Sequence, residues 1–269
     1  MKTINNNQWG DVWKNDMHAY DADSELMSMN IENVSVRCEK IMHYVKQHIG
    51  DLTQKKSVEV GCGGAIYSQI FARMGAIATL IDYSVEALEL AERNFTNLGL
   101  DADMIETDVF NLSSNLIEKF DVAMSFGTVE HYRYPERLEI CRAHIDLLRP
   151  GGICIISTPN IFFLPHELLK ILLVRKGKWF LGYEGSFSPF ELRNVGHKLG
   201  LRNIKIIGSS WRADLIRYMN IIRETNTFKN WFQTTNTQID ALLPPKKQTH
   251  NWLDDFIGHD IVLLGVKDV

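Results

Sequence analysis

The sequence predicts an α/β fold, namely a doubly wound sheet of mostly parallel strands with helices on both faces. The first observation is an alternation of β-prone runs and helix-like segments between Ser57 and Ser157, which is the pattern of βαβ units. The second is the apolar run within Ile153 to Ser157, which is typical of a strand buried on both faces. The third is a glycine-rich turn, residues 61–64, directly after the first predicted strand. Ligands of such sheets bind at the carboxyl ends of the strands.

Local signals define the individual elements. The predicted strands are short runs rich in apolar and β-branched residues, and they cover residues 57–60, 76–81, 103–106, 120–125, 153–157, 203–208 and 259–266. The predicted helices have apolar residues at helical spacing, and they cover residues 34–49, 65–74, 84–97, 135–148 and 188–200. Ser84 and Ser188 are the expected N-caps, and Pro135 is expected at the first helical position. Residues 149–152, Arg-Pro-Gly-Gly, are expected to form a turn.

The composition is that of an ordinary globular protein. The chain has 269 residues, of which 45% are hydrophobic and 23% charged, and its net charge is −4. A chain of this length can bury a full core, and this composition argues against general disorder. The negative charge argues against a nucleic-acid partner, because such partners need a basic face.

The cysteines and the hydropathy pattern indicate the setting of the protein. The four cysteines are scattered and form no C-x-x-C pair, so we expect neither a zinc site nor a disulfide framework. No apolar run is long enough to span a membrane, and the polar start of the sequence lacks a signal-peptide core. These observations favour a reduced, cytoplasmic protein.

The glycine-rich turn and the acid after the second strand predict a nucleoside-containing cofactor. Glycine at positions 61, 63 and 64 lets the backbone turn sharply and approach a ligand, at the N-terminal end of the next helix. Asp82, at the end of the second strand, can accept hydrogen bonds from both hydroxyls of a ribose. The dinucleotide pattern G-x-G-x-x-G is broken by Ile66, which disfavours a nicotinamide-dependent oxidoreductase. That class and a non-catalytic nucleoside-cofactor-binding protein remain as alternatives.

Five segments in register carry the remaining sequence signal. They are VEVGCGG (58–64), LIDYS (80–84), ETDVFNL (106–112), FDVAMSFGTVEHY (120–132) and LRPGGICIISTPN (148–160). Together they resemble the class I S-adenosylmethionine-dependent methyltransferases, in particular the type 11 and ubiquinone-biosynthesis-like small-molecule enzymes. The resemblance runs from about residue 57 to residue 208 and again over the last strand. It implies a Rossmann-like sheet of seven strands with an antiparallel last strand, and S-adenosyl-L-methionine as the cofactor.

The resemblance also implies which residues bind the cofactor. They are Glu59, Gly61, Cys62, Gly63, Asp82, Tyr83, Thr107, Asp108, Val109, Phe126, Gly127 and Glu130. In the family pattern Asp82 holds the ribose and Asp108 meets the adenine amino group, and Tyr83 is placed to lie against adenine. Each has a structural alternative: a tight turn for the glycines, a helix cap for Asp82, and an ordinary loop acid for Asp108.

His131 is the candidate general base. It follows the fourth strand, near the expected position of the transferred methyl group, and a base is required only if the acceptor is neutral, such as an alcohol. The alternative is that His131 only lines the pocket. Residues 125–128 read Ser-Phe-Gly-Thr, not the motif of nucleobase-amine methyltransferases, so a small-molecule acceptor is favoured. O-methylation is the first hypothesis and N-methylation of a small amine the second, and no metal is expected.

The remaining segments are expected to cover the strand ends. Residues 1–56 are expected to form an N-terminal helical lid, and 57–269 the cofactor-binding domain, with cap insertions at about 161–187 and 211–258. The expected substrate pocket is lined by Trp13, Tyr20, His131, Tyr132, Phe162 and Trp211. The alternative is that these aromatic residues pack the cap onto the sheet. The apolar stretch 161–174, followed by three basic residues within 175–178, also suggests contact with a membrane surface. The oligomeric state is not predicted.

Overall fold

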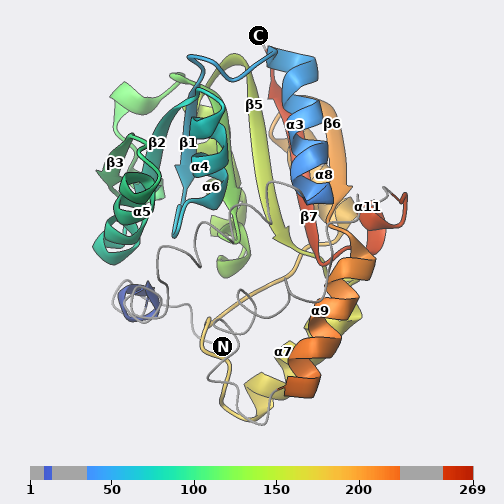
Figure 1. Ribbon diagram of the computed structural model, residues 1–269. Coiled ribbons are helices and arrows are strands. Elements are labelled where there is room, and N and C mark those ends of the chain that lie inside the picture. Colours follow the sequence, from blue (N-terminus) through green and yellow to red (C-terminus); the bar gives the residue numbers. More distant parts are fainter. Residues whose placement is uncertain (1–8, 14–34, 225–250, 269) are drawn as a thin grey trace.

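A single mixed sheet organises the part of the chain that the computed structural model describes, residues 9–13, 35–224 and 251–268. Its strands are β1 (Lys56–Val60), β2 (Ile77–Asp82), β3 (Ala102–Glu106), β4 (Phe120–Phe126), β5 (Leu148–Pro159), β6 (Leu201–Gly208) and β7 (Asp260–Lys267). Their order is β3-β2-β1-β4-β5-β7-β6, with parallel pairing from β3 to β5. β7 lies between β5 and β6 and is antiparallel to both, which confirms the predicted fold class (Figure 1).

Helices cover both faces of this sheet (Figure 1). After residue 35 the described helices are α3 (Val36–Ile49), α4 (Ile66–Arg73), α5 (Val85–Asn97), α6 (Glu136–Leu147), α7 (Leu164–Arg175), α8 (Pro189–Lys198), α9 (Trp211–Glu224) and α11 (Asp254–Ile257). Of these, α7 and α9 lie beyond the strand ends and not on a face of the sheet (Figure 1). On one face, Ile41 of α3 and Phe71 of α4 share a core cluster with Met124 of β4. On the other face, Ile140 of α6 and Leu192 of α8 belong to a second cluster. The sheet is therefore buried on both sides, as its apolar strands require.

The helix-start signals act as predicted, with one shift. The hydroxyls of Ser84 and Ser188 accept the backbone N–H groups of Ala87 and Glu191, so both serines are N-caps. Pro135 precedes the first residue of α6 and takes the capping position instead of the first helical one.

The prediction of a turn at residues 149–152 is wrong. β5 already begins at Leu148, and the four residues form an irregularity within the strand, since Phe120 pairs with Leu148 but Val122 pairs with Ile153. Gly151 adopts a φ of +80°, so the chain bulges there and continues in the same direction.

The cap helices lie beyond the carboxyl edge of the parallel strands. In Figure 1, α7 and α9 lie side by side there, and the rings of Phe163 and Tyr218 are in contact with centroids 5.1 Å apart. The short helical segment 9–13 lies at the same edge, below α5. α3, in contrast, was included in the expected N-terminal lid but packs on the sheet as part of one helical layer. Residues 225–250 of the second cap insertion lie outside the described part of the chain.

Candidate active site

The glycine turn after β1 has a backbone that only glycine adopts without strain. Gly61 and Gly63 have φ values of +63° and +48°. A Cβ atom on Gly61 would lie 2.5 Å from Cγ2 of Thr128, and one on Gly63 would lie 2.5 Å from the ring of Trp13. Because no side chain fits at either position, the turn presents bare backbone between β1, Thr128 and the N-terminal segment.

Two of the residues expected to bind the cofactor lie under this turn and hold it in place. Oε2 of the buried Glu59 accepts the backbone N–H of Ser68 at 3.1 Å and its hydroxyl at 2.5 Å. Burial raises the pKa of Glu59 to about 7. Cys62 packs into a core cluster with Ala65 and Leu80. Both side chains therefore fix the turn against α4 and the sheet.

Asp82 is a buried carboxylate whose hydrogen bonds come from backbone N–H groups. Oδ1 accepts the N–H of Ser84 at 2.9 Å, and Oδ2 accepts the N–H of Gly63 at 3.4 Å. Burial raises the pKa of Asp82 to about 6, although these backbone bonds favour the charged form. The backbone N–H groups of Tyr83 and Cys62 also favour the charged form of Asp82. Asp82 therefore both starts α5 and places a carboxylate beside the glycine turn.

The end of β3 lies next to the end of β2. The N–H of Thr107 donates to the carbonyl of Asp82 at 3.0 Å. Oδ1 of Asp108 accepts the N–H of Phe110 at 3.0 Å and thereby starts the short helical turn η1 (Val109–Asn111), while Val109 is buried in the core. Asp108 thus has a structural role, as the alternative interpretation holds, and also lies beside Asp82.

Tyr83 and Tyr132 lie near these two acids. Burial, and then the charges of Asp108 and Asp82, raise the pKa of Tyr132 to about 12. Burial also raises the pKa of Tyr83, and Tyr132, Asp82 and Asp108 add to the shift. The residues expected at the ribose and the adenine therefore gather at one place.

Phe126, at the end of β4, stacks on Tyr67 of α4 with ring centroids 3.6 Å apart. The guanidinium of Arg37 lies 5.9 Å from the Phe126 centroid and donates to Asp260 at 2.8 Å and to Ser157 at 3.3 Å. No sequence motif predicts Arg37, because it comes from α3 and is brought here only by the tertiary fold. It forms an ion pair with Asp260 beside the carboxyl ends of β4 and β5.

Gly127 and Glu130 follow β4. The N–H of Gly127 donates to Ser157 of β5 at 3.1 Å, and its φ is +77°. Glu130 is 2% exposed, and its Oε2 atom has no hydrogen-bond partner. Burial, and then the charge of Glu184, raise the pKa of Glu130 well above its usual range. Burial therefore favours the neutral form of Glu130, and its Oε2 is a buried polar atom without a hydrogen-bond partner.

His131 lies next to Glu130, within the short turn η3 (Val129–His131). Its Nδ1 donates to the carbonyl of Tyr183 at 3.0 Å, and its ring meets the ring of Trp9 edge-on at 4.8 Å. Burial lowers the pKa of His131, while the charge of Glu184 and nearby carbonyls oppose this shift. The ring is thus neutral near pH 7, as a proton acceptor must be.

The aromatic residues expected in the substrate pocket do not all lie at one place in the structure. Trp13 lies against Gly63, and its ring centroid is 6.1 Å from that of Trp9. Tyr20 lies outside the described residues.

Phe162 and Trp211 have their contacts elsewhere in the cap. Phe162 forms an exposed cluster with Phe190 and Phe256, because the buried Asn160 side chain ties the start of this segment to the carbonyls of Phe256 and Gly258. Trp211 begins α9 and donates its backbone N–H to Asp254. Phe162 therefore belongs to the outer wall of the cap, which corrects its expected placement in the pocket. Trp211 is half-buried and its indole Nε1 has no hydrogen-bond partner, so its place in the pocket stays a prediction.

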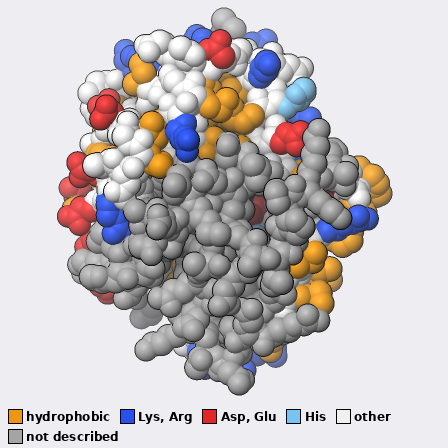
Figure 2. Space-filling view, in the orientation of Figure 1, with side chains coloured by type: hydrophobic (Ala, Val, Ile, Leu, Met, Phe, Trp, Pro, Cys, Tyr) orange, Lys and Arg blue, Asp and Glu red, His pale blue; other side chains and the backbone are white. Residues whose placement is uncertain are grey.

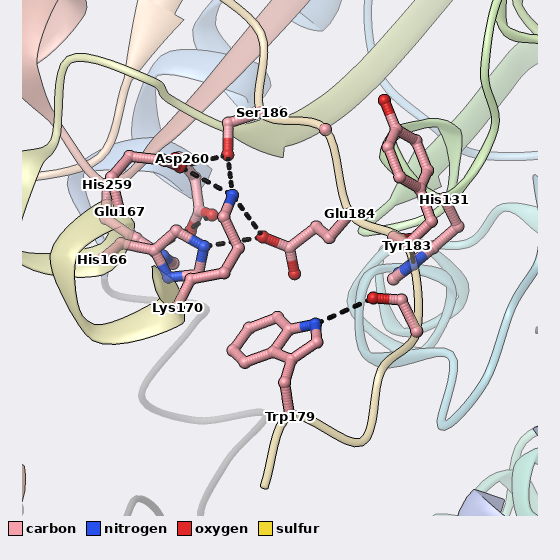
Figure 3. Close-up of polar contacts among 12 residues, drawn as sticks. His131, His166, Glu167, Lys170, Trp179, Tyr183, Glu184, Ser186, His259 and Asp260 are labelled. Atoms are coloured by element: carbon pink, nitrogen blue, oxygen red, sulfur yellow. Dashed lines mark hydrogen bonds and ion pairs between the residues drawn. The ribbon is translucent and has the colours of Figure 1, made fainter. Parts of the chain in front are cut away.

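A buried polar network under the cap is not predicted by any sequence pattern (Figure 3). His166 Nε2 lies 2.7 Å from Glu184 Oε1, and His166 Nδ1 lies 2.8 Å from the hydroxyl of Tyr218. Lys170 also contacts Glu184, at 3.3 Å. The residues of this network come from α7, from α9 and from the segment before α8, which are far apart in the sequence. The polar residues within the otherwise apolar α7 are the only sequence signal for it. Within the described ranges, no group of three or more His, Cys, Asp or Glu side chains could hold a metal ion.

Comparison with known proteins identifies the class that this fold and site define. Residues 58–156 match the family described as a methyltransferase domain. A ubiquinone biosynthesis O-methyltransferase of Histophilus somni is 37% identical over 159 residues, which are 56% of this chain and 66% of that protein. The corresponding enzyme of Actinobacillus pleuropneumoniae serotype 5b is 37% identical over 161 residues, which are 57% of this chain and 68% of that protein.

Solved structures agree at the level of the fold. The magnesium protoporphyrin IX methyltransferase of Synechocystis, with bound S-adenosylhomocysteine, has a TM-score of 0.55 and 15% identity, covering 90% of this chain and 84% of that one. The chain belongs to the class I S-adenosylmethionine-dependent methyltransferases. The bare glycine turn and the buried Asp82 carboxylate beside it fit the cofactor of this family.

Proposed function

We propose that the protein methylates a hydroxyl group of a small-molecule acceptor. The observation that carries this proposal is His131, a partly buried histidine with a lowered pKa at the carboxyl end of β4, near the glycine turn. An alcohol needs a base to take its proton, whereas a neutral amine does not. The relatives that are named O-methyltransferases support the same chemistry.

The residues of this chain then have distinct tasks. When bound, S-adenosylmethionine supplies an electrophilic methyl group on a positively charged sulfur. Asp82 and the glycine turn bind and orient the nucleoside, and Trp9 and Trp13 exclude water from above the turn. His131 receives the proton that the acceptor hydroxyl loses as its oxygen is methylated. Positioning supplies most of the rate in this scheme.

A transfer assay tests the reaction class. The purified chain is incubated with methyl-labelled S-adenosylmethionine and, separately, with a set of hydroxylated aromatic compounds and a set of small amines. We expect label in methyl ethers. Transfer to amines alone would support the alternative N-methyltransferase and overturn the proposal.

Substitution of His131 by alanine should lower kcat about 100-fold or more, the usual range for a lost general base. The Kd for S-adenosylhomocysteine should change less than about threefold, because His131 acts on the acceptor. In the wild-type protein, activity should be lost as the pH falls through the lowered pKa of His131, since the protonated ring accepts no proton. His197→Ala, at an exposed position on α8, is the control. Unchanged turnover in His131→Ala would remove this residue from the chemistry.

The partner in this proposal is a small acceptor, and the setting is the cytoplasm. The four cysteines are free and buried, which fits a reducing compartment. The net charge of −4 opposes a phosphate-rich partner. No helix among the described residues is long and apolar enough to cross a membrane.

We also propose that the cap touches an anionic membrane surface, because α7 exposes apolar side chains beside basic ones. Leu164, Leu168 and Leu172 are more than half exposed, and exposed basic residues follow at 175, 176 and 178. Figure 2 shows hydrophobic side chains gathered at the lower right, where α7 and α9 lie in Figure 1.

Co-sedimentation with vesicles of phosphatidylglycerol and phosphatidylcholine tests this surface. We expect binding that weakens with added salt and is reduced in Leu168→Glu, with pure phosphatidylcholine vesicles as the control. Absence of binding to the anionic vesicles contradicts the contact.

A further inference from the structure

Glu184 lies in a backbone segment that is fixed directly beside His131. The N–H of Gly185 donates to the carbonyl of Glu130 at 2.9 Å, and the carbonyl of Tyr183 accepts Nδ1 of His131 at 3.0 Å. Glu184 stands between these two anchor points, so its place relative to His131 is set by the backbone. Figure 3 shows its carboxylate between His166 on one side and His131 on the other.

The Glu184 carboxylate is buried but remains charged. Its side chain is 4% exposed, and Oε1 accepts Nε2 of His166 at 2.7 Å and Nζ of Lys170 at 3.3 Å. Burial alone raises the pKa of such a group, but the hydrogen bond and charge of His166, followed by Lys170, lower the pKa of Glu184 to about 2. A fixed negative charge therefore lies at the wall of the acceptor site.

A chain of hydrogen bonds holds His166 in the orientation that Glu184 requires. Nδ1 of His166 lies 2.8 Å from the hydroxyl of Tyr218, which lies 2.9 Å from Nε2 of His259. The contact with Tyr218 on one ring nitrogen leaves Nε2 of His166 facing Oε1 of Glu184. Burial lowers the pKa of His259, but the charge of the adjacent Asp260 outweighs this effect and raises it.

We propose that Glu184 is a positioning residue whose charge enables His131 to hold the proton taken from the acceptor. The inference rests on the proposed O-methylation. Burial makes a protonated His131 costly, and a nearby fixed carboxylate offsets that cost. The groups that face His131 are Glu184, the more distant Lys170, the carbonyls of Tyr183 and Leu181, and the ring of Trp9. Glu130, Tyr132 and Arg133 are the charged or titratable neighbours on its own segment.

Titration of the histidine ring nitrogens by NMR tests this role in the full chain without cofactor or acceptor. In Glu184→Gln the pKa of His131 should fall by about one unit, the lower end of the effect of a nearby opposite charge. Glu167→Gln is the matched control: it removes another carboxylate bound to Lys170, at 2.8 Å, and should shift the pKa of His131 by less than about 0.3 units. An unchanged pKa in Glu184→Gln, or equal shifts in both variants, overturns the proposal.

The wild-type protein provides a test that does not depend on the folding of a variant. Glu184 should stay ionised on carboxyl-carbon titration from pH 7 down to pH ~4, below the usual pKa of glutamate. A midpoint at or above the usual value contradicts the fixed charge. Glu184→Asp, which retains the charge, should keep the pKa of His131 above its value in Glu184→Gln. These measurements read only His131 and Glu184, so their failure is distinct from failure of methyl transfer.

Discussion

Asp82→Ala should raise the Kd for S-adenosylhomocysteine at least about 100-fold. Two hydroxyl donors to a charged acceptor contribute roughly 1.5–3 kcal/mol each, and about 1.4 kcal/mol corresponds to a factor of ten. The site is buried, so water replaces the lost carboxylate poorly. Isothermal titration calorimetry of the wild type and the variant measures the change.

Two comparisons separate this effect from damage to the fold. Asp82→Asn retains an acceptor for the N–H of Ser84 and should bind with intermediate affinity, whereas Asp101→Ala, at an exposed position, should bind normally. Wild-type binding should also weaken as the pH falls through about 6, where Asp82 takes up a proton, because its pKa is raised. Unaltered affinity in a folded Asp82→Ala protein contradicts the ribose assignment.

Gly61→Ala should both destabilise the protein and impair cofactor binding. A side chain there costs about 1–2 kcal/mol for the left-handed backbone and about 1–3 kcal/mol more for the clash with Thr128. Displacement of Thr128 also disturbs the turn that faces the cofactor. Urea unfolding and calorimetry measure the two effects.

Gly99→Ala is a matched control for this substitution. Gly99 has the same φ of +63°, but a Cβ on it would meet nothing within 4 Å. The free energy of unfolding of Gly99→Ala should fall only by the backbone contribution, about 1–2 kcal/mol, and its affinity for S-adenosylhomocysteine should stay normal. Equal destabilisation in the two variants would show that the contact with Thr128 is unimportant.

The cofactor side of the site could be predicted from the sequence because its residues follow the ends of consecutive strands. Parallel strands place their carboxyl ends at one edge, so Gly61, Asp82, Asp108 and Gly127 are close once the strand order is known. The motif does not distinguish residues that face a ligand from those that support the turn. Glu59, for example, belongs to the family's glycine motif, but its side chain accepts hydrogen bonds from Ser68 and thereby supports the turn.

The acceptor side could not be predicted in the same way. Arg37 and Glu184 come from α3 and from the segment before α8, and only tertiary packing places them near β4. Phe162 has the apolar character expected of a pocket residue, but the side-chain hydrogen bonds of Asn160 direct the chain to the outer wall of the cap. Hydrophobicity predicts burial or contact, but not which wall of the cap a residue joins.

Calorimetric titration of the wild-type protein with S-adenosylhomocysteine and, separately, with NAD tests the central claim most directly. The bare glycine turn, the Asp82 carboxylate and Ile66 in place of a third glycine predict saturable binding of S-adenosylhomocysteine and no binding of NAD. Binding of NAD without binding of S-adenosylhomocysteine would contradict the assignment of this site to methyl transfer.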